Sequence, residues 1–474
     1  MTRASLPTQK HQTPNHQLTM TVNKNIFKAY DVRGIYPTEI NATDAYAIGR
    51  AFVAHIKAST IAVGRDMRTA APEIAAAFID GATSQGANVT DYGMVATDML
   101  YYGVAKDGFD GGAEITASHN PKEYIGIKLV RRDAVPLSID TGIGIIRDMV
   151  ASDNIPQPGG KRGTHHSEDI LNGYIRHVLS FIDTTRIRPY HVVLDAGSGI
   201  AGLVAPHLFD RLSCKTTRMC FDVDGTFPNH EANPLLEENR RHIVERVIAE
   251  QADIGIAWDG DADRCFFIDG NGRFISGDLI TALLAQAFLL KSPGEKVIYD
   301  VRASHAIKDV VSARGGIALM NRVGHAFIKT RMREENAIFG GEVTGHYYFR
   351  DNFFADNGFI PALLILELMS IQEKTLSELL APLHKKYFLS GEINTKMPDM
   401  ETVEKKINTL ANRYRDGHVY RLDGVSVEFD DWHFNVRRSN TEPLIRLNLE
   451  ATTESEMKIK RDEILAIIRE PKQH

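Results

Sequence analysis

The sequence lacks the features that mark disulfide-rich, membrane-spanning and nucleic-acid-binding proteins. It has only three cysteines, an odd number without paired metal spacing, which argues against a disulfide framework and fits a reducing compartment. No apolar run is long enough to cross a bilayer, and residues 1–20 lack the apolar segment of a secretory signal. The formal net charge of −6 offers no basic field to a nucleic-acid backbone. We therefore expect a cytoplasmic protein that binds neither membranes nor nucleic acids.

What is present is the composition of a globular protein, with 43% hydrophobic and 24% charged residues. A chain of 474 residues is too long for one core and suggests roughly three to four domains. Three stretches share one build, in which an apolar β-branched strand runs into a polar turn and then a helix-like segment: 60–66, 191–199 and 296–304. A second and a third strand follow in each case, and this alternation predicts parallel sheets built from βαβ units.

The predicted fold class is α/β, with three related α/β domains of mixed, mostly parallel sheets and a smaller α+β C-terminal domain around one central cleft. Ligands of such sheets lie beyond the carboxyl ends of the strands, where each third strand carries an unusual polar cluster. Residues 156–169 read as a linker. The predicted divisions are a disordered extension at 1–25, α/β domains at 26–166, 167–270 and 271–385, and the α+β domain at 386–474.

The first cluster is ITASHNP (115–121), where Thr116, Ser118, His119 and Asn120 crowd into a turn. One interpretation is a helix N-cap, because Ser and Asn often satisfy the free amides at a helix start. The other is that Ser118 is exposed at a strand end so that it can react.

The second cluster, DGDADR, places carboxylates at Asp259, Asp261 and Asp263. On an extended segment this spacing points all three the same way, and crowded carboxylates need a cation, for which oxygen ligands favour Mg²⁺. A solvated acidic turn is the alternative. The pattern is not an EF-hand, because Arg264 stands where that loop needs Gly.

Two further loops suggest a sugar phosphate. In GGEVTGHYYF, Glu342 and Thr344 can grip vicinal hydroxyls, although an ordinary glycine-rich turn would look the same. The loop RRSNTEP joins two strands and is dense in donors that suit a phosphate, although a solvated hairpin is the alternative. Its candidate phosphate ligands are Arg437, Ser439, Asn440, Thr441 and Arg446.

Two short motifs point elsewhere. GSGIAG (197–202) matches the glycine pattern of dinucleotide-binding folds, with Asp222 about twenty residues on, where such folds place a ribose-binding acid. FDVDGTF (221–227) resembles a phosphatase motif in which the first Asp, here Asp222, is the nucleophile. Neither motif explains the other clusters.

Taken in order, KAYDVRG (28–34), TASHNP, DGDADR, GGEVTGHYYF and RRSNTEP resemble the α-D-phosphohexomutase family, most closely its bacterial phosphomannomutase/phosphoglucomutase branch. The resemblance runs from about Ile26 to the C-terminus. It implies four domains in a heart shape, and an isomerase that moves a phosphoryl group between C6 and C1 of hexose phosphates. The implied substrates are mannose 6-phosphate and mannose 1-phosphate, with glucose phosphates also accepted. The implied route uses a phosphoserine and a hexose 1,6-bisphosphate, which also serves as activator.

The resemblance also implies roles for single residues. Ser118 would carry the phosphoryl group and, with Asp259, Asp261 and Asp263, would hold Mg²⁺, while Arg264 supplies positive charge. The candidates for proton transfer are Lys128, Arg33 and His325, with Lys128 first, because cationic neighbours could lower the pKa of its amine. His119 would shape the loop or orient a phosphate. The implied sugar and phosphate contacts are Tyr30, Arg302, Glu342, Thr344, His346, Arg437, Ser439, Asn440, Thr441 and Arg446.

Two of these positions depart from the family pattern. Thr344 stands where the family more often has Ser, and Arg302 where it often has Lys. The sequence leaves open a phosphatase using Ser118 or Asp222, a nucleotide-binding oxidoreductase and a non-catalytic sugar-phosphate binder. It also leaves open the preference between mannose and glucose, the pathway served, the resting phosphorylation of Ser118, and whether the protein is a monomer or a homodimer.

Overall fold

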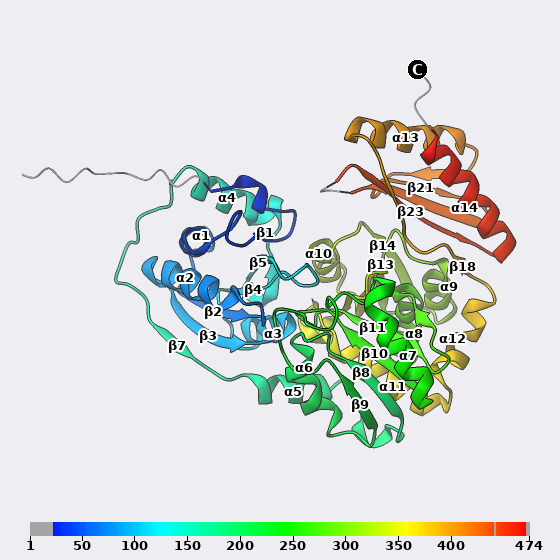
Figure 1. The fold of residues 1–474 in the computed structure, drawn as a ribbon, viewed down its shortest axis with the longest axis horizontal. Helices are drawn as coiled ribbons and strands as arrows, with labels where there is room; N and C mark the ends of the chain where they lie inside the picture. Colours follow the sequence, from blue (N-terminus) through cyan, green and yellow to red (C-terminus); the bar gives the residue numbers. More distant parts are fainter. Residues whose placement is uncertain (1–21, 440–441, 471–474) are drawn as a thin grey trace, which may run out of the picture.

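The computed structural model describes residues 22–439 and 442–470, which form four β-sheets with helices packed against them (Figure 1). The first sheet has the order β1-β5-β4-β2-β3-β7, with β6 beside β5. The second has the order β12-β11-β10-β8-β9, and the third β14-β13-β15-β16-β17. In each, three parallel strands continue into an antiparallel one, so β3-β2-β4-β5, β9-β8-β10-β11 and β14-β13-β15-β16 are equivalent. The threefold repeat and the fold class are thereby confirmed.

The first domain begins before the predicted boundary, since Val22 is buried and the 3₁₀ helix Lys24–Ile26 precedes β1; residues 1–21 lie outside the described part of the chain. The predicted linker at 156–169 contains β7, which pairs in parallel with β3. The strands are β1 Val32–Ile35, β2 Thr60–Arg65, β3 Asn88–Met94, β4 Gly111–Ile115, β5 Tyr124–Arg131, β6 Val135–Pro136 and β7 His165–Ser167. The helices are α1 Ala42–Ile56, α2 Ala71–Ser84, α3 Thr97–Lys106 and α4 Gly144–Ala151.

The second and third domains repeat the alternation of strand and helix. The second comprises α5 Leu171–Leu179, β8 His191–Asp195, α6 Ala201–Phe209, β9 Lys215–Met219, α7 Glu237–Glu250, β10 Ile254–Trp258, β11 Cys265–Asp269 and β12 Phe274–Ile275. The third comprises α8 Gly277–Lys291, β13 Lys296–Asp300, α9 His305–Ala313, β14 Ile317–Asn321, α10 His325–Glu335, β15 Phe339–Gly341, β16 Tyr347–Phe349, β17 Ala355–Asp356, α11 Phe359–Gln372 and α12 Leu376–His384.

The C-terminal domain is an antiparallel sheet with the order β18-β23-β22-β21-β20, covered by two helices. Its strands are β18 Phe388–Leu389, β19 Ile393–Lys396, β20 His418–Tyr420, β21 Val425–Glu428, β22 Trp432–Arg438 and β23 Leu444–Ala451. Its helices are α13 Met400–Arg413 and α14 Glu454–Arg469.

One hydrophobic core is shared by three of the domains. A continuous cluster of buried side chains runs through the first, second and third domains. Helix α11 is buried on nearly every side within it, which is why its sequence is apolar all round rather than amphipathic. The C-terminal domain has a separate core. Among the described residues, no helix combines the length and apolar character needed to span a membrane.

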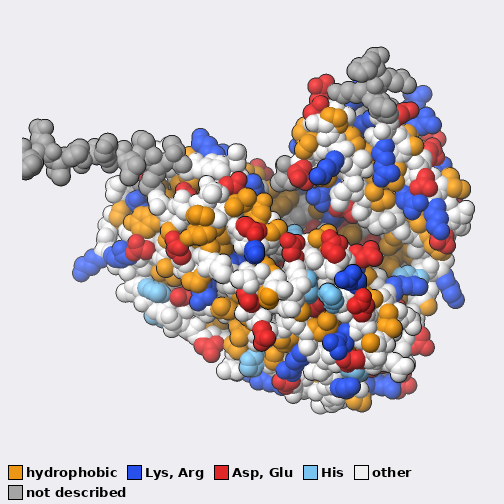
Figure 2. Space-filling model, viewed as in Figure 1, with side chains coloured by type: hydrophobic (Ala, Val, Ile, Leu, Met, Phe, Trp, Pro, Cys, Tyr) orange, Lys and Arg blue, Asp and Glu red, His pale blue; other side chains and the backbone are white. Residues whose placement is uncertain are grey.

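The surface is hollowed between the C-terminal domain and the rest of the molecule (Figure 2). The polar clusters at the ends of β4, β10 and β15 converge near this hollow, and an isolated bridge between Arg264 and His346 joins two of the loops. The sheets therefore position the candidate site at the carboxyl ends of their strands.

Candidate active site

Ser118 lies in a turn that joins β4 to β5. Its φ is 50°, in the left-handed region, and its amide donates to Thr116 Oγ1 at 2.9 Å. No helix begins here, so the N-cap interpretation is wrong. The expected exposure is also wrong, since Ser118 is 2% exposed. The reason is that its hydroxyl faces protein carboxylates, donating to Asp259 Oδ2 at 2.9 Å.

A buried arginine that the motifs did not single out holds this turn in shape. Arg68 donates to the carbonyl oxygens of Ser118 at 2.7 Å and Asn120 at 2.6 Å, and to two more carbonyls that follow. Its Nε lies 3.3 Å from Asp66 Oδ2. The available signal was the polar GRD sequence at the end of β2, beside the strand that carries Ser118.

The three aspartates meet in a turn and not on an extended segment. Ala262 takes a left-handed φ of 59°, and one carboxylate oxygen from each aspartate lies within 4.8 Å of the others. Burial, with the charges of Asp263 and Asp261, raises the pKa of Asp259 to about 7. Among the described residues, Asp261 Oδ1 is buried without a hydrogen-bond partner. A buried, unpaired carboxylate oxygen in an all-oxygen cluster fits a hard divalent cation such as Mg²⁺.

Lys128, on β5, does not have the predicted environment. Its Nζ lies 2.6 Å from both Asp261 Oδ2 and Asp263 Oδ2. Burial favours the neutral amine, but these two carboxylates outweigh it and hold the pKa of Lys128 well above its ordinary value. The prediction of a lowered pKa is therefore wrong, because the immediate neighbours are anions and not cations. Thr97, which the motifs also missed, donates to Asp261 Oδ2 at 2.6 Å.

A series of contacts connects the aspartates to the candidate sugar-binding residues of the loop GGEVTGHYYF. Arg264 Nε lies 3.6 Å from Asp259 Oδ2 and 3.2 Å from His346 Nε2. His346 Nδ1 lies 3.4 Å from Glu342 Oε2. Burial and Arg264 disfavour the imidazolium, but Asp263 and Glu342 outweigh them and raise the pKa of His346 to about 9. Thr344 is half-buried in the same turn.

The remaining catalytic candidates, Arg33, His119 and His325, lie around Ser118 and His346. Arg33 donates to the side chains of Asn120 and Asp31. His119 Nδ1 lies 3.1 Å from Ser118 Oγ, and burial with the charges of Arg264 and Arg33 holds its pKa well below the ordinary value. His325 begins α10, with its ring centroid 6.0 Å from that of His346. Burial and the charge of Lys329 hold the pKa of His325 well below the ordinary value too.

A cationic pocket lies beyond Glu342, whose Oε1 accepts from the amide of Gly324 at 3.0 Å. The pocket has a volume of about 660 Å³, and residues of all but the second domain line it, including Tyr30, Gly324 and Ser439. Asn440 and Thr441 lie outside the described residues. The arginines that line it are Arg322, Arg421, Arg437, Arg438 and Arg446. The sequence motifs identified Arg437 and Arg446 but missed Arg322 and Arg421.

One carboxylate organises the wall of this pocket. Glu392 accepts from Arg437 at 3.0 Å and from Arg446 at 2.8 Å, and it lies 3.5 Å from Arg302 Nη1. Burial opposes its charge, but the three guanidinium groups hold the pKa of Glu392 at about 2. Arg302 is buried and donates two hydrogen bonds of 2.9 Å to Asp300. It also lies 3.7 Å from Glu342, so it connects the loop that carries Glu342 to the arginine pocket. Glu392 has no motif around it, so sequence reasoning missed its role.

The two competing motifs have structural explanations. A Cβ added to Gly199 would lie 2.6 Å from the carbonyl oxygen of Gly260, and the amide of Ile200 donates to that oxygen at 2.9 Å. The glycine therefore lets this loop pack against the aspartate turn. Asp222 is exposed on the loop after β9.

Comparison with known proteins agrees with this geometry. Family models described as phosphoglucomutase/phosphomannomutase match the chain in four parts: alpha/beta/alpha domain I at 24–155, domain II at 172–272, domain III at 276–387 and the C-terminal domain at 392–467. A protein named phosphohexose mutases from Xanthomonas campestris pv. campestris (strain B100) is 43% identical over 90% of this chain and 94% of its own. Phosphomannomutase from Escherichia coli (strain K12) is 42% identical over the same shares.

A solved structure extends the comparison to three dimensions. The phosphoglucomutase/phosphomannomutase family protein of Burkholderia thailandensis superposes with a TM-score of 0.86 at 31% identity, covering 95% of this chain and 98% of that one. The predicted family, the fold and the classification as a mutase are thereby confirmed. The chain belongs to the phosphoglucomutase/phosphomannomutase family of phosphohexomutases.

Proposed function

We propose that the protein interconverts hexose 6-phosphates and hexose 1-phosphates through a phosphorylated Ser118 and a hexose 1,6-bisphosphate. The observation that carries the proposal is the unbroken series of contacts from Ser118 through Asp259, Arg264, His346 and Glu342 to the arginine pocket. A reactive hydroxyl at one end and a cationic pocket at the other suit a substrate that carries a phosphate and presents a hydroxyl away from it.

Two transfers in opposite directions make up the proposed reaction. In the first, O1 or O6 of the sugar attacks phosphoserine, the bond between phosphorus and Ser118 Oγ breaks, and the hydroxyl loses its proton. The bisphosphate then presents its other phosphate to Ser118, whose oxygen receives that group as the sugar oxygen regains a proton. The arginine pocket holds the non-reacting phosphate in both transfers, and Glu342 with Thr344 holds the ring hydroxyls.

Mg²⁺ is the proposed cofactor, held by Asp259, Asp261, Asp263 and an oxygen of phospho-Ser118. When bound, the cation would neutralise charge on the oxygens of the transferring phosphoryl group. Arg264 supplies a fixed positive charge beside Asp259, and Lys128 keeps the carboxylates close together at 2.6 Å contacts.

An uncharged imidazole is the proposed proton acceptor. His119 and His325 both have lowered pKa values, so they are neutral near pH 7, whereas the Lys128 amine is held charged. His119 is the better placed of the two beside Ser118. For the substrate, mannose and glucose phosphates differ only at the C2 hydroxyl, and accepting both needs no dedicated group there.

A phosphatase is the closest alternative, and mannose 1-phosphate distinguishes the two activities. We expect the protein to form mannose 6-phosphate without equivalent release of inorganic phosphate, in a reaction that needs Mg²⁺ and is activated by a hexose 1,6-bisphosphate. Ser118→Ala should abolish turnover even with the bisphosphate, while Asp222→Asn should leave it intact because Asp222 is exposed. Phosphate release at the rate of substrate loss, or loss of turnover only in Asp222→Asn, would establish the phosphatase instead.

A further inference from the structure

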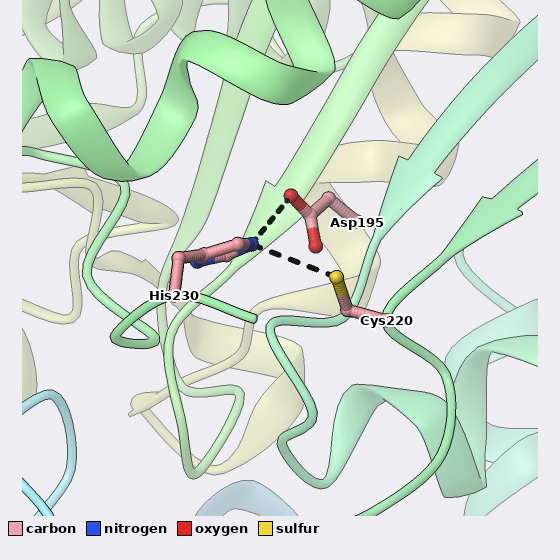
Figure 3. Close-up of side chains that lie close together, drawn as sticks. All are labelled: Asp195, Cys220 and His230. Carbon is pink, nitrogen blue, oxygen red and sulfur yellow. Dashed lines mark hydrogen bonds and ion pairs between the residues drawn. The ribbon is translucent and has the colours of Figure 1, made fainter. Parts of the chain in front are cut away.

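Three metal-ligand side chains meet at the edge of the second sheet, outside the proposed active site (Figure 3). Asp195 ends β8, Cys220 follows β9, and His230 comes from the loop before α7. One ligand atom of each lies within 4.8 Å of the other two. Asp195 is buried, and Cys220 and His230 are half-buried.

The donor atoms converge on one point. His230 Nε2 lies 3.1 Å from Asp195 Oδ2 and 3.7 Å from Cys220 Sγ. Bonds of about 2.0–2.1 Å to nitrogen and oxygen and about 2.3 Å to sulfur, set at a tetrahedral angle, separate such donors by roughly 3.4–3.6 Å. The two separations from His230 Nε2 fall close to these values, and the third pair of donors lies within 4.8 Å, so a tetrahedral ion fits with small side-chain movements.

The second nitrogen of His230 is fixed as a metal-bound imidazole requires. Nδ1 lies 2.9 Å from the carbonyl oxygen of Glu231, which can only accept, so Nδ1 carries the proton and Nε2 points to the cluster. Asp195 is held in the same way, because its Oδ1 accepts from the amide of Gly197 at 2.9 Å and Oδ2 is left for the cluster.

A proton relay is another arrangement that a Cys, a His and an Asp can form. A relay needs the carboxylate on one imidazole nitrogen and the thiol on the other. Here both face Nε2, because Glu231 takes Nδ1. This geometry presents three donors to one ion and does not pass a proton through the ring.

We propose that Asp195, Cys220 and His230 form a binding site for a divalent transition metal ion, with Zn²⁺ the best fit and a solvent molecule as fourth ligand. A thiolate with an imidazole selects Zn²⁺ over Mg²⁺, which prefers oxygen ligands. The site is therefore chemically distinct from the aspartate cluster proposed to hold Mg²⁺.

The metal would fasten a loop that reaches the first domain. A Cβ on Gly225 would lie 2.4 Å from the carbonyl oxygen of Met67, so the loop backbone packs directly against that segment. Three residues before His230, the ring of Phe227 lies 5.4 Å from the guanidinium of Arg68, which holds the Ser118 turn. Metal binding at His230 should therefore stabilise the junction between the first and second domains.

Cobalt titration tests the site, because Co²⁺ bound to a thiolate absorbs in the near-ultraviolet and Co²⁺ bound only to oxygen does not. We expect the reduced, metal-stripped protein to gain this band at one equivalent and to lose it when Zn²⁺ is added. Cys220→Ser should lack the band, and Cys214→Ser, which removes a half-buried thiol elsewhere, should retain it. No band in the unaltered protein, or an undiminished band in Cys220→Ser, would overturn the proposal.

A second measurement needs no variant. Alkylation of the unaltered protein, followed by peptide mass mapping, should be at least tenfold slower at Cys220 with Zn²⁺ present than with Mg²⁺. Cys214 serves as the internal control and should react equally in both. Equal alkylation of Cys220 under the two conditions would contradict a zinc site.

Discussion

At the scale of single residues, Glu392 shows how a carboxylate can keep a cationic pocket in shape. Three arginines surround it, and without it they would repel one another. Because Glu392 accepts from Arg437 and Arg446, these side chains are already oriented when an anion arrives. The cost is that an incoming phosphate must share these donors with Glu392.

The lowered pKa of Glu392 predicts a pH dependence of stability. Its pKa falls from an ordinary value of 4.5 to about 2 in the folded protein. Its charge therefore stabilises the fold fully above pH 4.5, and this contribution is lost as the pH falls toward 2. In urea unfolding, we expect the difference between the unaltered protein and Glu392→Gln to shrink by about 2 kcal/mol from pH 7 to pH 3.

Glu404→Gln is the matched control, since Glu404 makes an exposed pair with Arg438. Its effect should be small at both pH values. If Glu392→Gln lowers stability equally at pH 7 and pH 3, the carboxylate charge is not what holds the arginines.

At the scale of structural elements, the turn between β4 and β5 depends on Arg68. The side chain is 1% exposed and donates to four carbonyl oxygens, those of Ser118, Asn120, Pro121 and Tyr124. Removing this guanidinium would leave those carbonyls and the Asp66 carboxylate buried without the contacts that Arg68 makes to them. The loss of such buried contacts is strongly destabilising.

We therefore expect Arg68→Met to destabilise the protein by roughly 3–5 kcal/mol and to lower kcat, because Ser118 loses its fixed position. Arg132→Met, which removes a side chain in an exposed pair with Asp110, should change stability by no more than about 1 kcal/mol. Urea unfolding and steady-state kinetics measure both effects. Unchanged kcat in a folded Arg68→Met protein would show that the turn holds Ser118 without Arg68.

The strands and the loops at their ends could be predicted from the sequence, because local pattern determines them. Each of β2, β8 and β13 is an apolar, β-branched run, and each begins at the predicted position. The aspartates and Ser118 were also found, since each lies in a dense local cluster. The contact between Asp259 and Ser118, 141 positions apart, was expected from the shared strand edge together with the family resemblance.

Long-range contacts account for what the sequence did not reveal. Arg68 and Glu392 act through partners from distant segments. The polar residues at the end of β2 are the only local sign of Arg68, and no motif surrounds Glu392. The error at Lys128 has the same origin, because its anionic neighbours come from the aspartate turn of another domain. Burial of Ser118 likewise depends on that turn and not on its own loop.

At the scale of the whole molecule, the C-terminal domain meets the third domain through polar contacts. Asp423 Oδ2 accepts from the amide of Val323 at 3.0 Å, and Glu450 Oε1 accepts from the amide of His305 at 3.1 Å. Its core is separate, whereas one core runs through the other three domains. Domains joined in this way move more readily than those that share a core.

A ligand in the arginine pocket should therefore tie the two domains together. Segment 322–324 of the third domain and segment 421–424 of the C-terminal domain both line it. In hydrogen–deuterium exchange with mannose 6-phosphate, we expect both segments to gain protection together. Helix α4 of the first domain does not line the pocket and should show no change. Protection of only one segment would mean that the phosphate does not bridge the domains.

Phosphate mapping tests the central claim most directly. After incubation with Mg²⁺ and glucose 1,6-bisphosphate, digestion and mass analysis should find a single phosphate on the peptide that contains Ser118. A chase with mannose 6-phosphate should remove that phosphate at the rate of turnover. Turnover that proceeds while Ser118 stays unmodified, or a phosphate on another residue that exchanges in its place, would contradict the account.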